Sequence, residues 1–232
     1  MRTLIAVASV AALLAACGDN PPPSTGDSPA APAPAENPAA APAPIPEKAE
    51  QAEASGWRGI ASAADAANLG RLDEAWRLAR AEAEDKGFAS QVEALGPLVD
   101  PNAGQAGRLQ PSPGTYRCRT VKLGAKAEGG LAYVAYPFFR CTVELTPGGD
   151  LILTKTTGSQ RTRGLLYPDT DRRLVFIGAQ AWGADETGFP AYGAQSERDQ
   201  VGVFERIGPE RWRMVVPWPR VESKLEILEL AR

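Results

Sequence analysis

The feature that most constrains the fold is a two-residue alternation of side-chain character that begins at Gly114. Tyr116, Cys118 and Thr120 occupy alternate positions, and the same period returns over residues 139–145. Successive side chains of a β-strand point to opposite faces, so this period indicates strands that bury one face. The chain from residue 101 to residue 232 is therefore predicted to be a mainly β domain.

Further strand-like runs follow, separated by turn signals at residues 147–150 and 208–210. Seven or eight short strands in a row favour an antiparallel barrel or sandwich, and a meander of this size resembles the small lipocalin-like barrels. The last run also fits the period of a helix. The runs cover residues 151–156, 163–167, 173–178, 201–207, 211–216 and 224–230.

The residues before the β domain have a helical period. Ser62 with Asp65 three residues later resembles a capping box, and Gly87 is a typical helix end. We expect residues 56–100 to form a helical segment that packs on the β domain. The apolar stripe that would face it consists of Leu69, Leu72, Trp76, Ala79 and Ala83.

The first sixteen residues have the layout of a secretory signal peptide, with Arg2 before an apolar run and small residues before Cys17. Residues 14–17, Leu-Ala-Ala-Cys, are similar to the lipobox of bacterial lipoproteins. The resemblance implies that Cys17 carries a lipid that anchors the chain to a membrane, facing the periplasm, and Gly18 favours the outer membrane. An ordinary signal peptide cut near a chance cysteine is the alternative. Residues 17–55, rich in proline and alanine, are predicted to be a disordered linker.

The chain contains no histidine, which removes the usual general base and the commonest transition-metal ligand. No cofactor and no metal site is therefore predicted. Residues 56–232 carry 23 basic and 22 acidic side chains. Because a nucleic-acid-binding surface needs an excess of basic residues, nucleic acid is not expected as a partner.

Two cysteines remain once Cys17 is lipidated. Exported proteins usually pair such cysteines, so we predict a disulfide between Cys118 and Cys141. The alternative is two separately buried thiols.

Two polar segments are candidates for binding. Residues 155–164 form the most donor-rich stretch of the β region, and Ser159, Gln160 and Arg161 constitute the candidate binding loop. A hairpin loop that satisfies its own backbone is the alternative. Residues 179–200 lack strand periodicity and are predicted to form a lid or recognition loop, unless their acids are simply solvated. The candidates there are Trp182, Asp185, Glu186, Tyr192, Glu197, Arg198 and Asp199.

Several stretches taken together resemble domain-of-unknown-function family 4893, which occurs in exported proteins of alphaproteobacteria. The likeness extends from Trp57 to the C-terminus and implies no activity, cofactor or catalytic residue. It does imply that the two cysteines and the Gly-Ser-Gln-Arg loop are features of the family. The stretches are residues 114–124, 136–141, 158–161, 197–202, 211–213 and 217–219.

These observations favour a membrane-tethered binding module, whose ligand is either a small apolar molecule or a protein of the cell envelope. A structural or assembly lipoprotein is the alternative, and the two differ in whether the barrel interior is open or filled by side chains. An enzyme is least favoured. A hydrolase using Ser159 or the acids of residues 185–199 would lack both a histidine and a recognisable nucleophile–base spacing.

Overall fold

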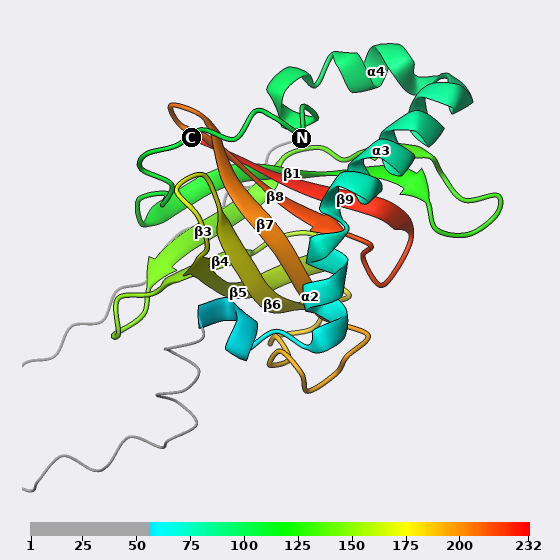
Figure 1. Ribbon diagram of the computed structural model, residues 1–232. Helices are drawn as coiled ribbons and strands as arrows, with labels where there is room; N and C mark the ends of the chain where they lie inside the picture. Colours follow the sequence, from blue (N-terminus) through cyan, green and yellow to red (C-terminus); the bar gives the residue numbers. More distant parts are fainter. Residues whose placement is uncertain (1–55) are drawn as a thin grey trace, which may run out of the picture. The chain divides into compact units, whose positions relative to one another are not determined.

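The computed structural model describes residues 56–232, so the predicted signal peptide, Cys17 and the linker lie outside the described residues. The core is one antiparallel sheet in which β1 and β9 pair, and this pairing closes eight strands into a barrel with β2 outside it (Figure 1). The mainly β prediction is confirmed, and the barrel is the correct alternative. The strands are β1 (Gly114–Ala125), β2 (Tyr133–Ala135), β3 (Phe139–Leu145), β4 (Leu151–Lys155), β5 (Gln160–Pro168), β6 (Leu174–Trp182), β7 (Asp199–Gly208), β8 (Arg211–Pro217) and β9 (Ser223–Ala231).

The last apolar run is a strand, so the helical interpretation of residues 224–230 is wrong. β9 is hydrogen-bonded on both sides, to β8 and to β1. Strand β6 is longer than its predicted counterpart and reaches Trp182. All of its residues before Trp182 are buried. A strand covered on both faces shows no alternation, which is why the sequence pattern did not reveal this part of it.

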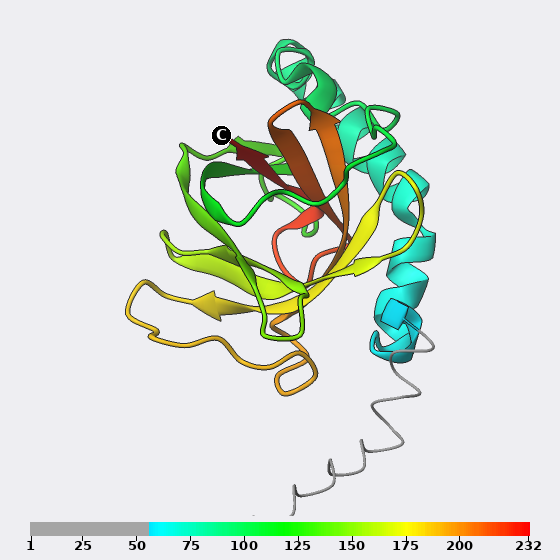
Figure 2. The ribbon, with the colours of Figure 1, turned by 90° about the vertical axis from the view of Figure 1, so that its left-hand side faces the viewer.

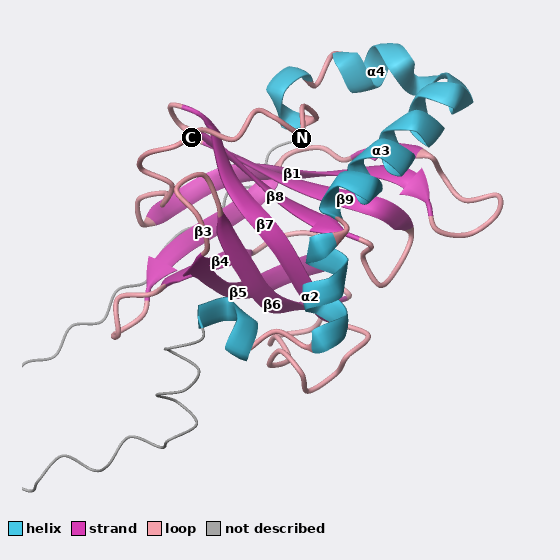
Figure 3. Cartoon of the chain, in the orientation of Figure 1, coloured by secondary structure: helices cyan, strands magenta, loops and turns pink. Residues whose placement is uncertain are grey.

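The predicted N-terminal helical segment is also confirmed, and it lies along one side of the barrel (Figures 2 and 3). Ser62 caps its first α-helix by accepting a hydrogen bond from the backbone N–H of Asp65 at 3.1 Å. Gly87, with φ of 90°, interrupts the segment after α3 as expected. The elements are a 3-10 turn (Gly56–Gly59), α2 (Ala63–Gly70), α3 (Leu72–Ala83), a π turn (Glu84–Phe88), α4 (Ala89–Glu93) and a 3-10 turn (Gly96–Leu98). None of the helices in residues 56–232 combines the length and the apolar character needed to cross a bilayer.

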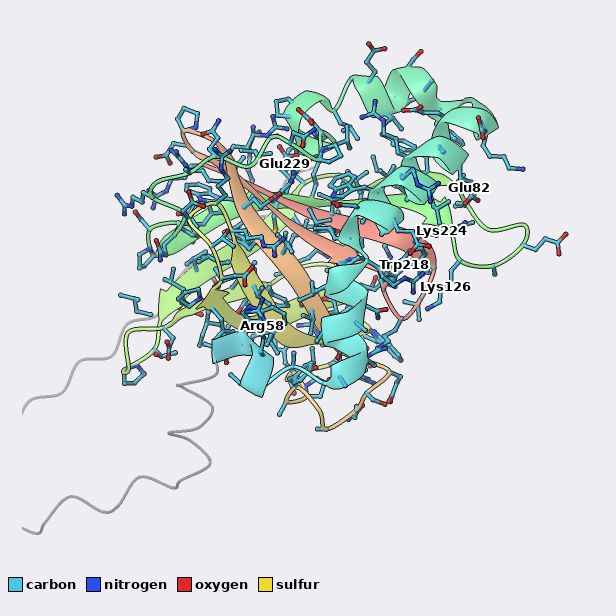
Figure 4. The ribbon with its side chains drawn as sticks, viewed as in Figure 1. Arg58, Glu82, Lys126, Trp218, Lys224 and Glu229 are labelled. Atoms are coloured by element: carbon cyan, nitrogen blue, oxygen red, sulfur yellow. A yellow bond between two sulfur atoms is a disulfide. The ribbon has the colours of Figure 1, made fainter. Side chains whose placement is uncertain are left out.

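Helix α3 packs closely against the outer face of β1 and β9. Ala79 has no exposed surface, and a Cβ on Gly124 of β1 would lie 2.8 Å from the Cα of Ala79. The glycine therefore permits a contact distance that no other residue would allow. Glu82 stabilises the same interface, because its carboxylate accepts hydrogen bonds from the backbone N–H of Ala125 at 3.2 Å and from the Lys224 ammonium (Figure 4).

Arg213 of β8 ties the end of the helical segment to the barrel. Its side chain has no exposed surface. The guanidinium donates to the carbonyl oxygens of Leu98 at 3.1 Å and Asp100 at 2.6 Å, and to Glu205 at 2.8 Å. The bond to Leu98 satisfies a buried carbonyl group, and together the bonds hold residues 98–100 on the barrel.

One end of the barrel interior is filled by apolar side chains. Tyr116 and Trp212 meet edge to face there with ring centroids 5.8 Å apart, and Phe176 and Phe204 are fully buried beside them. The predicted disulfide is confirmed: Cys118 and Cys141 join β1 to β3 in this core. Closing a loop of this length contributes about 3 kcal/mol in the chain-entropy model.

A pair of glycines lets β5 and β6 approach more closely than side chains would permit. Gly164 and Gly178 are direct register partners. A Cβ on Gly178 would lie 2.1 Å from the carbonyl oxygen of Arg163 and 2.6 Å from the Cα of Gly164. Glycine inside a strand commonly marks such a close backbone approach.

Candidate functional site

The other end of the barrel interior is polar. The inward alternation of the strands continues there, so that Lys122 follows Thr120 on β1 and Lys155 follows Leu153 on β4. Each of these polar side chains is 7% exposed or less. The loops after β1, β4, β6 and β8 gather at this end. The buried polar residues are Thr120, Lys122, Lys155, Thr162, Gln180, Gln200 and Glu226.

Lys122 is fully partnered within this cluster. Its Nζ donates to Oε1 of Gln160 at 2.7 Å and to the carboxylate of Glu222, and it lies 3.7 Å from Oε2 of Glu226. Gln160 also donates from Nε2 to Glu222 at 3.0 Å. Burial by itself would lower the pKa of Lys122, but Glu226 and Glu222 outweigh that effect and raise the pKa above its ordinary value.

Lys155 has a different environment. The residue is 5% exposed, its Nζ donates to the carbonyl oxygen of Gln160 at 2.6 Å, and it lies 4.1 Å from the centroid of the Phe139 ring. No carboxylate of residues 56–232 lies within ion-pair distance of it. Burial lowers the pKa of Lys155 to about 8, against a weaker opposing effect of Glu226. Burial also raises the pKa of Glu226, against the opposing effects of Lys122 and Lys155.

A pocket of about 190 Å³ opens above Lys155. Gly158 leaves room for the two side chains, because a Cβ at that position would lie 3.0 Å from Nζ of Lys155 and 3.0 Å from the Phe139 ring. The loop after β4 therefore lies directly against the lysine at one side of the pocket. The lining residues are Thr120, Tyr136, Phe139, Lys155, Ser159, Gln160 and Glu222. We call this the mouth pocket.

The predicted binding loop is divided by the structure. Ser159 and Gln160 line the mouth pocket, as a ligand site would require. Arg161 does not line it, since neighbouring side chains of a strand point to opposite faces. Its guanidinium donates instead to the carbonyl oxygens of Gly183, at 3.2 Å, and Glu186. Arg161 thus holds the loop after β6 in place.

The predicted recognition loop has structural contacts of its own. The Glu186 carboxylate accepts a hydrogen bond from Arg198 at 2.7 Å and one from the backbone N–H of Trp182 at 2.7 Å. The hydrogen bond from Arg198 lowers the pKa of Glu186. The Arg198 guanidinium lies 4.7 Å from the centroid of the Trp182 ring. These contacts fix the loop and engage the charges of Glu186 and Arg198 within it.

One further residue of that loop, Tyr192, contacts α2. The Tyr192 hydroxyl donates to Asp65 at 2.6 Å, and Asp199 accepts from the backbone N–H of Gly193 at 2.9 Å. Burial raises the pKa of Asp199. Asp185 and Glu197 are exposed. None of the seven predicted residues of this loop lines the mouth pocket.

Sequence reasoning missed Lys122 and Glu226, although a signal was available. Both continue an inward-facing alternation, after Tyr116, Cys118 and Thr120 on β1 and before Leu228 and Leu230 on β9. A charged residue at an inward position of a barrel strand is therefore the pattern that would have found them. Tyr136 and Glu222 lie in loops, where no periodicity marks them.

No three acidic, histidine or cysteine side chains in residues 56–232 are grouped so that they could hold a metal ion.

A family model described as a domain of unknown function, DUF4893, matches residues 57–230, well over half of the chain. No curated protein and no solved structure matches this chain.

Proposed function

The chain belongs to the DUF4893 family, whose description states no function, and from that premise we propose that it is a binding module that takes a small anionic ligand in the mouth pocket. The observation that carries the proposal is the buried ammonium of Lys155, which faces the pocket without a carboxylate partner among the described residues. A buried charge is costly unless an opposite charge compensates it. A bound anion would supply that compensation.

The contents of the barrel decide where a ligand fits. The apolar end of the interior is filled by Phe176, Phe204 and their neighbours, which argues against an apolar molecule enclosed there. The polar end offers unused hydrogen-bond donors. Lys155 has three ammonium protons, one of which is donated to Gln160, and the Ser159 hydroxyl lines the same pocket. A carboxylate or phosphate group suits these donors.

Lys155→Met is expected to lower the affinity for butyrate by tenfold or more, because it removes the ammonium that attracts the anion. The measurement is a titration of the full chain carrying Cys17→Ser, so that no lipid or detergent is present, followed by backbone amide NMR. Butyramide, which has no charge, is expected not to bind. Lys86→Met is the matched control, since Lys86 is exposed on the helical segment. Equal butyrate affinity in wild type and Lys155→Met would contradict the proposal and favour the structural or assembly alternative.

The same binding is expected to weaken as the pH rises through about 8. Only the protonated amine attracts an anion, and burial lowers the pKa of Lys155 to about 8. The charged groups that act on it are Glu226 on β9 and Lys122 on β1, together with Arg161 on β5, whose side chain points to the other face of the sheet. Affinity should fall towards tenfold per pH unit above that point. A constant butyrate affinity up to pH 10 would show that another cation holds the anion.

We also propose that the module works tethered to the periplasmic face of a membrane, the outer membrane being favoured. The lipobox-like residues 14–17 support this, and each buried methylene of an acyl chain contributes about 0.8 kcal/mol to anchoring. Cys17→Ser is expected to abolish incorporation of labelled palmitate and to release the protein from the membrane fraction. Labelling that persists in the variant would refute the anchor.

A further inference from the structure

A larger hollow adjoins the mouth pocket. It has a volume of about 500 Å³ and lies between the segment after β1 and the loop after β8; of its lining residues, Figure 4 labels Lys126. Tyr136 and Glu222 line both hollows, so the two meet at these side chains. We call the larger one the groove. Its lining consists of Lys122, Lys126, Ala127, Gly130, Leu131, Val134, Tyr136, Arg220, Val221, Glu222 and Ser223.

The groove combines an apolar surface with positive charge. Leu131 is 70% exposed, more than any other large apolar side chain of the described residues. Lys126 donates to the carbonyl oxygens of Pro219 at 2.8 Å and Arg220 at 2.6 Å, and no carboxylate of residues 56–232 is within ion-pair distance of it. The one acid in the lining, Glu222, is held by Lys122 and Gln160. Its charge is therefore compensated.

The loop that forms one wall of the groove is held in an unusual conformation. Trp218 and Glu222 have φ of 51° and 70°, the only positive values outside glycine in residues 56–232. Such backbone is disfavoured for residues with a Cβ, and it persists where the surroundings require it. Here it brings the Glu222 carboxylate onto the Lys122–Gln160 pair. Lys122 and Gln160 thus bind a carboxylate group at the border between the groove and the mouth pocket.

We propose that the ligand is a carboxylate with an acyl chain, whose head group binds Lys155 in the mouth pocket and whose chain passes over Tyr136 into the groove. This inference rests on the proposed function of the mouth pocket. Charge complementarity places the head group at the buried ammonium, and the exposed Leu131 with the half-buried Val134 of the groove offers apolar surface for the chain. An exposed apolar patch rimmed by polar residues commonly marks a ligand groove.

The test is a titration series with butyrate, hexanoate, octanoate and decanoate, each below its micelle concentration, on the full chain carrying Cys17→Ser. Affinity is expected to rise about threefold to fourfold per added methylene, the factor that corresponds to about 0.8 kcal/mol for a buried CH₂ group. Octanol, which has the chain without the charge, is expected to bind at least tenfold more weakly than octanoate. Lys155→Met should lower the affinity for every acid of the series.

A pair of leucine variants locates the chain. Leu131→Ser is expected to lower the affinity for decanoate about fivefold or more, because its side chain lines the groove. Leu145→Ser is the matched control: Leu145 is 58% exposed on β3 and does not line the groove, so decanoate affinity should not change. Both side chains are exposed, so neither variant should disturb folding.

The outcomes separate the two proposals. Butyrate binding that depends on Lys155 but shows no gain with chain length would overturn the acyl-chain inference and leave the anion site in place. The absence of binding by every acid would overturn both. Octanol affinity equal to that of octanoate would overturn the placement of the head group, and equal effects of the two leucine variants would overturn the placement of the chain.

Discussion

Arg213→Met is expected to lower the free energy of unfolding by about 3–5 kcal/mol, the usual cost of breaking a buried ion pair by removing one partner. The arginine has no exposed surface and bonds Glu205 together with the carbonyl oxygens of Leu98 and Asp100. Methionine fills a similar volume but donates no hydrogen bond. The Glu205 carboxylate and the two carbonyl groups would then be left without their partner. Urea-induced unfolding, followed by circular dichroism, measures the loss.

Two further variants test the cause of this effect. Arg206→Met removes a neighbouring arginine that makes one side-chain hydrogen bond, to the carbonyl oxygen of Ala106 at 2.9 Å in an exposed setting. It should cost less than about 1 kcal/mol. Arg213→Lys should still destabilise, because a single ammonium cannot replace a planar group with five donors. A loss below about 1 kcal/mol for Arg213→Met would show that the attachment of residues 97–101 does not depend on this side chain.

Gly178→Ala is expected to destabilise the barrel by about 3 kcal/mol, at the upper end of the range for overpacking. The new Cβ would lie 2.1 Å from the carbonyl oxygen of Arg163 and 2.6 Å from the Cα of Gly164. Both are backbone atoms, so no side chain can move aside to relieve the contact. Strands β5 and β6 would have to separate. Thermal unfolding monitored by circular dichroism measures the shift.

Gly188→Ala is the matched control for this substitution. No heavy atom lies within 4 Å of a Cβ at Gly188, and its φ is not positive. The control should change the free energy of unfolding by less than about 0.5 kcal/mol. Equal unfolding temperatures for the two variants would mean that the strands can separate at little cost, and that the glycine pair is not a determinant of the barrel shape.

Local patterns in the sequence predicted most of the fold. The alternation could be recognised in the first half of β1 and in β3, because there one face of the strand is core and the other is partly solvated. The disulfide followed from counting cysteines in a chain expected to be exported. Closure between β1 and β9 joins residues that are 98 to 114 positions apart, from Ala125 with Ser223 to Arg117 with Ala231. No local pattern contains that information, which is why a sandwich was an open alternative.

The candidate site was only partly predictable. Ser159 and Gln160 stood out because they lie in a polar stretch, and they do line the mouth pocket. Arg161 shared that stretch but faces the other way, which composition cannot reveal. The acids of residues 185–199 were candidates for a site because they are dense in the sequence. In the structure, Glu186 and Asp199 accept hydrogen bonds from residues of their own loop. The role of these acids depends on their hydrogen-bond partners in the folded chain, which their spacing in the sequence does not reveal.

The way the barrel closes has a consequence for biosynthesis. Strand β9 supplies the final nine-residue strand of the barrel and pairs with both β8 and β1. A polypeptide is made from its N-terminus, so β1 and β8 exist as unpaired edges until residues 223–231 have been added. Unpaired edges are templates for association with other chains. A product that ends before residue 223 would therefore be an open, association-prone sheet rather than a smaller barrel, because the edges of β1 and β8 stay unpaired until β9 has been made.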